Sequence, residues 1–137
     1  MKIRNRHGRS RSRSRSGAAA VELALLLPVF CYICVAATDY SRVFYALATL
    51  SDSARAGAIY YATRPSATNS GIQQAALADA SDLNPAPTIT TATGTDASGN
   101  AYMQVTAAYQ FTTLMPYPGI PSTVNLSRQV TMMPNPP

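Results

Sequence analysis

Glu22 is the residue whose type and position most strongly suggest chemistry in this chain. It stands in the run AAAVELALLLPVFCYICVAA, residues 18–37, where it is the only charged side chain. A carboxylate at the centre of a membrane helix costs about 2.5–3.5 kcal/mol, and less near an end of the helix. Two interpretations are open: Glu22 has a function inside the apolar run, or its side chain reaches the lipid headgroups from one turn inside the membrane.

The residues around Gly17 suggest proteolytic processing. The segment from Arg15 to Leu23 resembles the cleavage site of a prepilin peptidase, in which a basic leader ends in glycine and a glutamate is the fifth residue of the mature chain. Cleavage after Gly17 would make Ala18 the new amino terminus. Glycine suits such a cut because a peptidase needs extended backbone, and glycine breaks a helix there at little steric cost.

The spacing of Ala18 and Glu22 would give the carboxylate a cationic partner. A freed α-amino group is a cation at the cytoplasmic edge of a helix, and a carboxylate about one turn further lies at similar depth. Within one helix, or between neighbouring helices, each charge compensates the other in lipid. In pilins, which this site resembles, the glutamate is thought to select and register incoming subunits.

A longer stretch narrows the resemblance to TadE-like pseudopilins, which serve the tight-adherence (Flp) pilus machinery. Residues 17–28, GAAAVELALLLP, are similar to the opening pattern G-A-x-x-V-E-F-A-L-x-x-P of that family, with Leu23 where phenylalanine is common. Residues 39–45 resemble its D-x-x-R-x-x-Y stretch, and residues 50–58 its L-x-x-A-A-R-x-G-A-R stretch, with Ile59 where arginine is usual. The resemblance implies four further motif residues: Asp39, Arg42, Arg55 and Gly57.

The resemblance implies a minor pseudopilin, processed by a prepilin peptidase, that takes part in assembly of an adhesive Flp/Tad-type pilus. Its implied partners are the peptidase, other pilins and pseudopilins, the inner-membrane assembly platform and membrane lipid. It would cross the bacterial inner membrane once, and whether it enters the filament is open. The alternative is an unprocessed, signal-anchored envelope protein whose exported domain is a binding module.

The charge distribution predicts the orientation of this membrane segment. Seven Lys and Arg side chains precede Gly17 with no carboxylate among them, whereas the rest of the chain has four arginines and six carboxylates, a net charge of −2. Positively charged flanks stay in the cytoplasm, so the amino terminus should lie inside and the carboxyl domain outside. The Arg-Ser repeat at residues 9–16 also suggests nucleic-acid binding, but a leader beside a membrane span explains it better, and we expect no nucleic-acid partner.

An ordinary secretory signal peptide is a further alternative, with Ala36-Ala37-Thr38 as its cleavage site. Signal peptides have an apolar stretch of about 7–15 residues followed by small residues. The greater length of the apolar run and the charge at its fifth position count against this interpretation.

Helical periodicity continues beyond the apolar run. Pro28 removes one backbone hydrogen bond, so we expect a kink there. Asp39 with Arg42, and Asp52 with Arg55, are spaced as i, i+3 charge pairs. Arg64-Pro65 should end the helix, because the residue before proline disfavours the α region. An apolar stripe is predicted at spacings of three and four: Val43, Leu47, Leu50, Ala54, Ala58 and Tyr61.

The carboxyl half has the pattern of a short helix followed by strands. Ser70 to Gln73 has the spacing of a capping box, predicting a helix from there to about Asp82. Strand patterns cover residues 88–93, 101–111 and 124–132. Arg128 falls on the apolar side of the last strand, which predicts either an edge strand or a paired arginine.

The predicted fold is therefore α+β and pilin-like: a long amino-terminal helix, its first half transmembrane, carries a small helix and an antiparallel sheet of about three strands. The expected divisions are a basic leader (1–17), a transmembrane helix (18–37), an extramembrane continuation of the helix (38–64) and an exported domain (65–137).

Several residues that suggest catalytic or metal sites have simpler explanations. Cys31 and Cys34 form C-x-x-C, but they lie in the apolar run without other Cys or His nearby, so packing is expected. His7 is the only histidine and lies in the leader. Asp96 and Asn100 suggest a calcium site, yet turn chemistry explains them. We therefore expect no enzyme activity, cofactor, metal site or small-molecule substrate.

Overall fold

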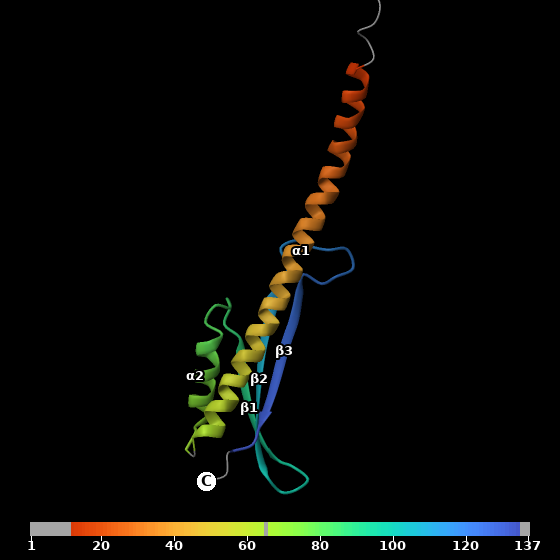
Figure 1. Ribbon diagram of the computed structural model, residues 1–137. Coiled ribbons are helices and arrows are strands. Elements are labelled where there is room, and N and C mark those ends of the chain that lie inside the picture. The colour runs from red at the N-terminus through yellow and green to blue at the C-terminus, as the bar shows by residue number, and fades with distance from the viewer. Residues whose placement is uncertain (1–11, 65, 135–137) are drawn as a thin grey trace, which may run out of the picture. The chain divides into compact units, whose positions relative to one another are not determined.

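Two helices precede a three-stranded sheet in this chain. The computed structural model describes residues 12–64 and 66–134. Its elements are α1 (Ser12–Thr63), α2 (Asn69–Asp79), β1 (Thr88–Thr95), β2 (Ala101–Thr112) and β3 (Thr123–Met132) (Figure 1). This confirms the predicted α+β layout of a long helix, a short helix and an antiparallel sheet. The chain divides into two compact units between Thr38 and Asp39.

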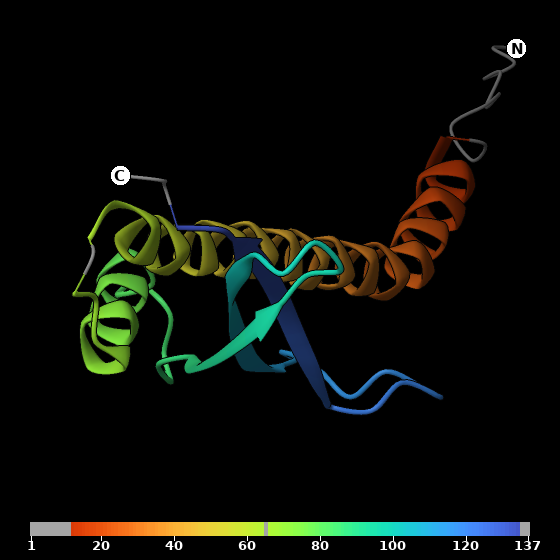
Figure 2. The same ribbon diagram turned by 90° about the horizontal axis from the view of Figure 1, so that it is seen from below.

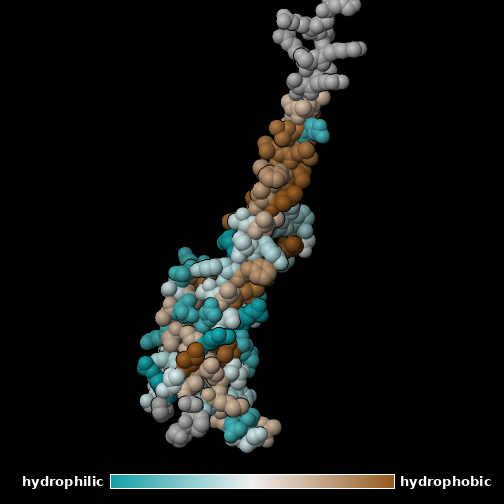
Figure 3. All heavy atoms as spheres, viewed as in Figure 1, coloured by the Kyte–Doolittle hydropathy of each residue, from teal (hydrophilic) through white to brown (hydrophobic). Residues whose placement is uncertain are grey.

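The first unit, Met1–Thr38, contains the amino-terminal part of α1, whose described surface from residue 17 onward is largely apolar. Every described residue from Gly17 to Cys34 is exposed. Hydrophobic side chains gather over this part of the helix in Figure 3. By length and composition α1 is apolar enough to cross a membrane, a property that signal sequences share. Pro28 lies inside α1, and the kink expected there stays a prediction. The leader residues 1–11 lie outside the described residues.

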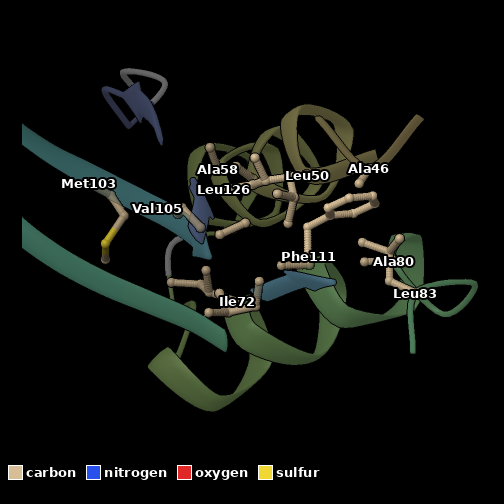
Figure 4. Packing of buried hydrophobic residues seen from close by; sticks show 14 residues of the cluster. Ala46, Leu50, Ala58, Ile72, Ala80, Leu83, Met103, Val105, Phe111 and Leu126 are labelled. Atoms are coloured by element: carbon tan, nitrogen blue, oxygen red, sulfur yellow. The ribbon is translucent and has the colours of Figure 1, made fainter. Parts of the chain in front are cut away.

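The second unit is built on the carboxyl-terminal part of α1. Leu50, Ala54 and Ala58 of the predicted stripe are fully buried, while Val43, Leu47 and Tyr61 are partly buried at the rim of the core. Ala54 and Ala58 are small, which allows close approach of the elements that pack on α1. Figure 4 shows side chains of α1, α2 and β2 meeting in one cluster that includes Leu50, Ile72 and Phe111.

Helix α2 begins two residues earlier than the capping-box pattern predicted. Thr68 is the N-cap: its hydroxyl accepts a hydrogen bond from the Gly71 amide at 3.2 Å. The predicted box at Ser70 is wrong, because Gly71 stands where its glutamine would have to be, and the Gln73 side chain instead donates to the Ile89 carbonyl at 3.4 Å. The helix ends at Asp79, three residues before the predicted end.

The sheet is an antiparallel meander in the order β1-β2-β3. Alternate side chains of the central strand β2 are buried, among them Met103, Val105 and Ala107. The second half of α1 runs over these strands in Figure 2. Arg128 is exposed on β3 opposite Ala107, so the structure selects the edge-strand interpretation of this residue.

Candidate functional site

The residues of the predicted processing site lie on one exposed stretch of α1. Gly17, Ala18 and Glu22 are all helical and exposed. Ala18 and Glu22 are four residues apart, a spacing that places them on the same face of an α-helix. An amino group at Ala18 and the carboxylate of Glu22 could therefore compensate each other within one chain or across a contact with another.

Gly17 departs from the extended backbone expected at a cleavage site. Helix α1 begins at Ser12 and continues through Gly17 without interruption. A single glycine costs a helix only about 1 kcal/mol relative to alanine, so one glycine does not end a long helix. Glycine also has a lower helix propensity than its alanine neighbours, so the helix is locally weaker at this position.

Asp39 is a buried polar residue of the second unit that contacts three other residues. Its side chain is buried, with the residue only 5% exposed. One carboxylate oxygen accepts a hydrogen bond from Arg42 Nη1 at 2.9 Å, confirming the predicted i, i+3 pair. The other accepts from the Leu114 amide and from the Tyr117 hydroxyl, both at 2.9 Å. Asp39 therefore joins α1 to the loop between β2 and β3, 75 residues further along the chain.

These contacts keep Asp39 ionised. Burial raises the pKa of its carboxyl, but hydrogen bonds from Leu114, Tyr117 and Arg42, with the positive charge of Arg42, outweigh burial and hold the pKa below its ordinary value. A negative charge is thus stable in this partly enclosed site.

Arg42 extends the same cluster toward the sheet. Its guanidinium carbon lies 5.1 Å from the centre of the Phe111 ring, close enough for a cation–π contact. Beside it is an open hollow of about 250 Å³. Two hydrogen bonds join residues that line the hollow. The Tyr45 hydroxyl donates to the Asp82 carboxylate at 3.3 Å, and the Tyr109 hydroxyl donates to the Asn84 carbonyl at 3.1 Å. These bonds tie together the elements around the hollow.

Gly57 lies where α1 meets α2 and β2. A Cβ atom at this position would lie 3.2 Å from the Ala76 Cβ, the Ile72 carbonyl oxygen and Val105 Cγ1. The Ser53 hydroxyl, one turn earlier, donates to the Ala76 carbonyl at 2.8 Å. The structural consequence of a glycine at 57 is close contact between the two helices.

The second predicted charge pair is absent from the described part of the chain. Asp52 and Arg55 are both exposed, and no salt bridge joins them there. Water solvates both charges well, so holding two long side chains together gains little. That prediction was wrong, and Arg55 remains an exposed cation on α1.

The loop at residues 113–122, between β2 and β3, is a feature to which the sequence patterns assigned no role. It is anchored to Asp39 and exposes Leu114, Met115 and Ile120. The sequence signal was present: three large apolar side chains stand among prolines, without a charged residue.

The remaining candidate sites from the sequence are the cysteine pair, the turn at Asp96 and a possible metal site. Cys31 and Cys34 are free and exposed. The Asp96 carboxylate accepts from the amides of Ser98 and Asn100 at 2.9 and 2.8 Å, as turn chemistry predicted. Within residues 12–64 and 66–134, no group of three or more His, Cys, Asp or Glu side chains could hold a metal ion.

A family model described as TadE-like protein matches residues 17–58. The match confirms the resemblance seen in the sequence over this segment, which holds Gly17, Glu22, Asp39 and Gly57. The chain matches no curated protein and no solved structure.

Proposed function

We propose that this chain, which carries a TadE-like segment at residues 17–58, is a minor pseudopilin of a Tad-type pilus. It acts as a structural subunit in pilus assembly rather than as an enzyme. A prepilin peptidase removes the leader after Gly17, and the mature chain is held in the inner membrane by residues 18–37.

One observation carries this proposal: a lone carboxylate stands one helical turn after the Gly17-Ala18 bond, on an exposed apolar helix, inside the family match. An exposed apolar surface of this extent favours lipid or protein contact. An unpaired carboxylate would oppose that contact, so the arrangement favours a cation at the same depth.

Processing supplies that cation. Hydrolysis of the Gly17-Ala18 peptide bond adds water, leaving a carboxylate on Gly17 and a protonated amine on Ala18. The amine of one subunit can then meet Glu22 of its own helix or of a neighbouring pilin. Pairing between subunits would fix their axial register, since a helix displaced by one turn loses the contact.

The orientation follows from the arginine-rich leader. The amino terminus would lie in the cytoplasm, within reach of the peptidase and of the assembly platform. The unit that begins at Asp39 would lie on the periplasmic or extracellular side, where its sheet and the surface of α1 are available to other pilus proteins.

The mass of the protein extracted from membranes tests the proposal directly. A mature chain that begins at Ala18 supports it. An intact leader would support the alternative, a signal-anchored envelope protein with an exported binding domain, and a chain that begins after Ala37 would identify a secreted protein. Both of those results contradict the proposal.

A further inference from the structure

The loop between β2 and β3 presents an apolar surface to its surroundings. Leu114, Met115 and Ile120 are 56%, 40% and 56% exposed. No charged residue occurs between Asp96 and Arg128 in the sequence, so the surface of the loop has no ionic group of its own. Exposure of three large apolar side chains within one uncharged loop favours contact with lipid or with another protein.

The loop is held in a defined conformation. At its base the Thr113 amide donates to the Ser122 carbonyl at 3.0 Å, and within it the Ile120 amide donates to the Tyr117 carbonyl at 3.1 Å. Gly119 has a φ of 80°, which a side chain would disfavour. The exposure of the apolar side chains is therefore a consequence of a formed turn.

Asp39 holds this loop against the part of α1 that begins the second unit. Its carboxylate accepts from the Leu114 amide and the Tyr117 hydroxyl, both at 2.9 Å. Only Thr38 separates Asp39 from Ala37, the last residue of the apolar run. At a rise of about 1.5 Å per residue, Asp39 stands about 3 Å along the helix from the end of that run.

Exposed aromatic residues follow on the next turn of α1. Tyr40 and Phe44 are 68% and 54% exposed, and their ring centres are 4.7 Å apart. Tyr and Trp side chains are enriched where the hydrocarbon of a membrane meets the headgroups, which applies to Tyr40; Phe44 adds apolar surface beside it. Asp39, which holds the loop, and Tyr40 thus follow Ala37, the last residue of the apolar run, by two and three residues in the sequence.

We propose that the loop at 113–122, with Tyr40 and Phe44, lies in the headgroup layer of the same bilayer that holds residues 18–37. The ligand is lipid, on the side of the membrane opposite the leader. Asp39 is the positioning residue, because its carboxylate ties the loop to the emerging helix. The inference rests on the membrane span of the proposed function, but on neither cleavage nor pilus assembly.

A lipid surface fits better than a second protein chain as the occupant. Asp39, which holds the loop, follows the apolar run by two residues in every molecule, so the proposed contact with lipid does not require that another protein be bound. The loop also lacks the charged groups that would select one protein partner over another.

The chain has no tryptophan, so one introduced indole reports the surroundings of a single site. We would compare three full-length variants: Ile120→Trp in the loop, Phe30→Trp in the apolar run, and Ala97→Trp in the exposed β1–β2 turn. Each variant is reconstituted in phosphatidylcholine–phosphatidylglycerol liposomes. The lipids are brominated either near the headgroups or deep in the acyl chains. We expect Ile120→Trp to lose emission most with shallow bromines and Phe30→Trp with deep ones. Ala97→Trp, with the same intrinsic preference of indole for interfaces, should lose little with either.

Each remaining outcome overturns the inference in a recognisable way. Quenching of Phe30→Trp without quenching of Ile120→Trp beyond the Ala97→Trp level would remove the loop from the membrane and leave the proposed function intact. Absence of quenching at Phe30→Trp would refute the membrane span and the loop inference together. Protection of Ile120→Trp from aqueous iodide only after pilins are added would show that a protein covers the loop.

The role of Asp39 is tested in the Ile120→Trp background. Adding Asp39→Asn should reduce the shallow quenching, because a neutral amide holds the Leu114 amide and Tyr117 more weakly. Adding Asp52→Asn, an exposed control on the same helix, should leave the quenching unchanged. Equal quenching in both double variants would refute Asp39 as the positioning residue.

Discussion

Replacing Asp39 by alanine should lower the stability of the unit from Asp39 to Pro137 by about 2–4 kcal/mol. The carboxylate accepts two hydrogen bonds of 2.9 Å, from the Leu114 amide and the Tyr117 hydroxyl. Bonds to a charged acceptor contribute about 1.5–3 kcal/mol each, and both donors are only partly buried, so water recovers part of the loss. The ion pair with half-exposed Arg42 adds about 0–1 kcal/mol.

The change should be large in a melting experiment. For a domain of 60–100 residues, 1 kcal/mol corresponds to about 4–8 °C, so the melting temperature should fall by about 8–32 °C. Near-ultraviolet circular dichroism of the tyrosines would follow unfolding of the full chain in detergent. Asp52→Ala is the matched control, because Asp52 is exposed on the same helix. Equal melting temperatures for the two variants would refute the role assigned to Asp39.

The pH dependence of stability gives a second test of the same residue. The pKa of Asp39 is lowered in the folded state, so the unfolded chain binds the proton more readily. The contribution of Asp39 is present above its unfolded pKa, about 4, and is lost as the pH falls through the lower folded pKa. Asp39→Asn should remove this part of the acid sensitivity. An unchanged difference between pH 7 and pH 3 in that variant would contradict the prediction.

Two further substitutions test the helix at different points. Gly57→Leu should destabilise the fold by about 1–3 kcal/mol or more, because its Cβ alone would lie 3.2 Å from the Ile72 carbonyl oxygen. Urea unfolding measures this, with Ala48→Leu as the exposed control on the same helix. A urea midpoint of Gly57→Leu no lower than that of the control would contradict the prediction. Gly17→Ala should stabilise the helix at the cut by about 1 kcal/mol and slow processing about fivefold. Processing at the wild-type rate, measured by pulse labelling, would show that unwinding at Gly17 does not limit cleavage.

The local features of this fold were predictable from the sequence. The stripe with Leu50 and Ala58 follows from a helical period, and the buried alternation in β2 follows from a period of two. The pair between Asp39 and Arg42 follows from their spacing of three. Each of these features depends only on residues within a few positions of one another, so the local sequence pattern is enough to predict it.

The features that the sequence did not predict depend on distant partners. The i, i+3 rule identifies Arg42 as a neighbour of Asp39, but it has no means of finding Leu114 and Tyr117. The same rule wrongly predicted a bridge from Asp52 to Arg55, because spacing alone does not distinguish a partly buried pair from a solvated one. Asp39 is buried, and its ion pair with Arg42 is formed. Asp52 and Arg55 are both exposed to water, and no ion pair joins these two residues, both of which the structure describes.

Pilus assembly by a Glu22→Ala strain tests the central claim most directly. The claim is that the carboxylate pairs with the amine freed at Ala18, so this variant should be cleaved and present at normal level while assembling few or no pili. Val21→Ala, a neighbouring change without loss of charge, should assemble normally. Normal piliation of the Glu22→Ala strain, with the protein cleaved and at wild-type level, would contradict the account.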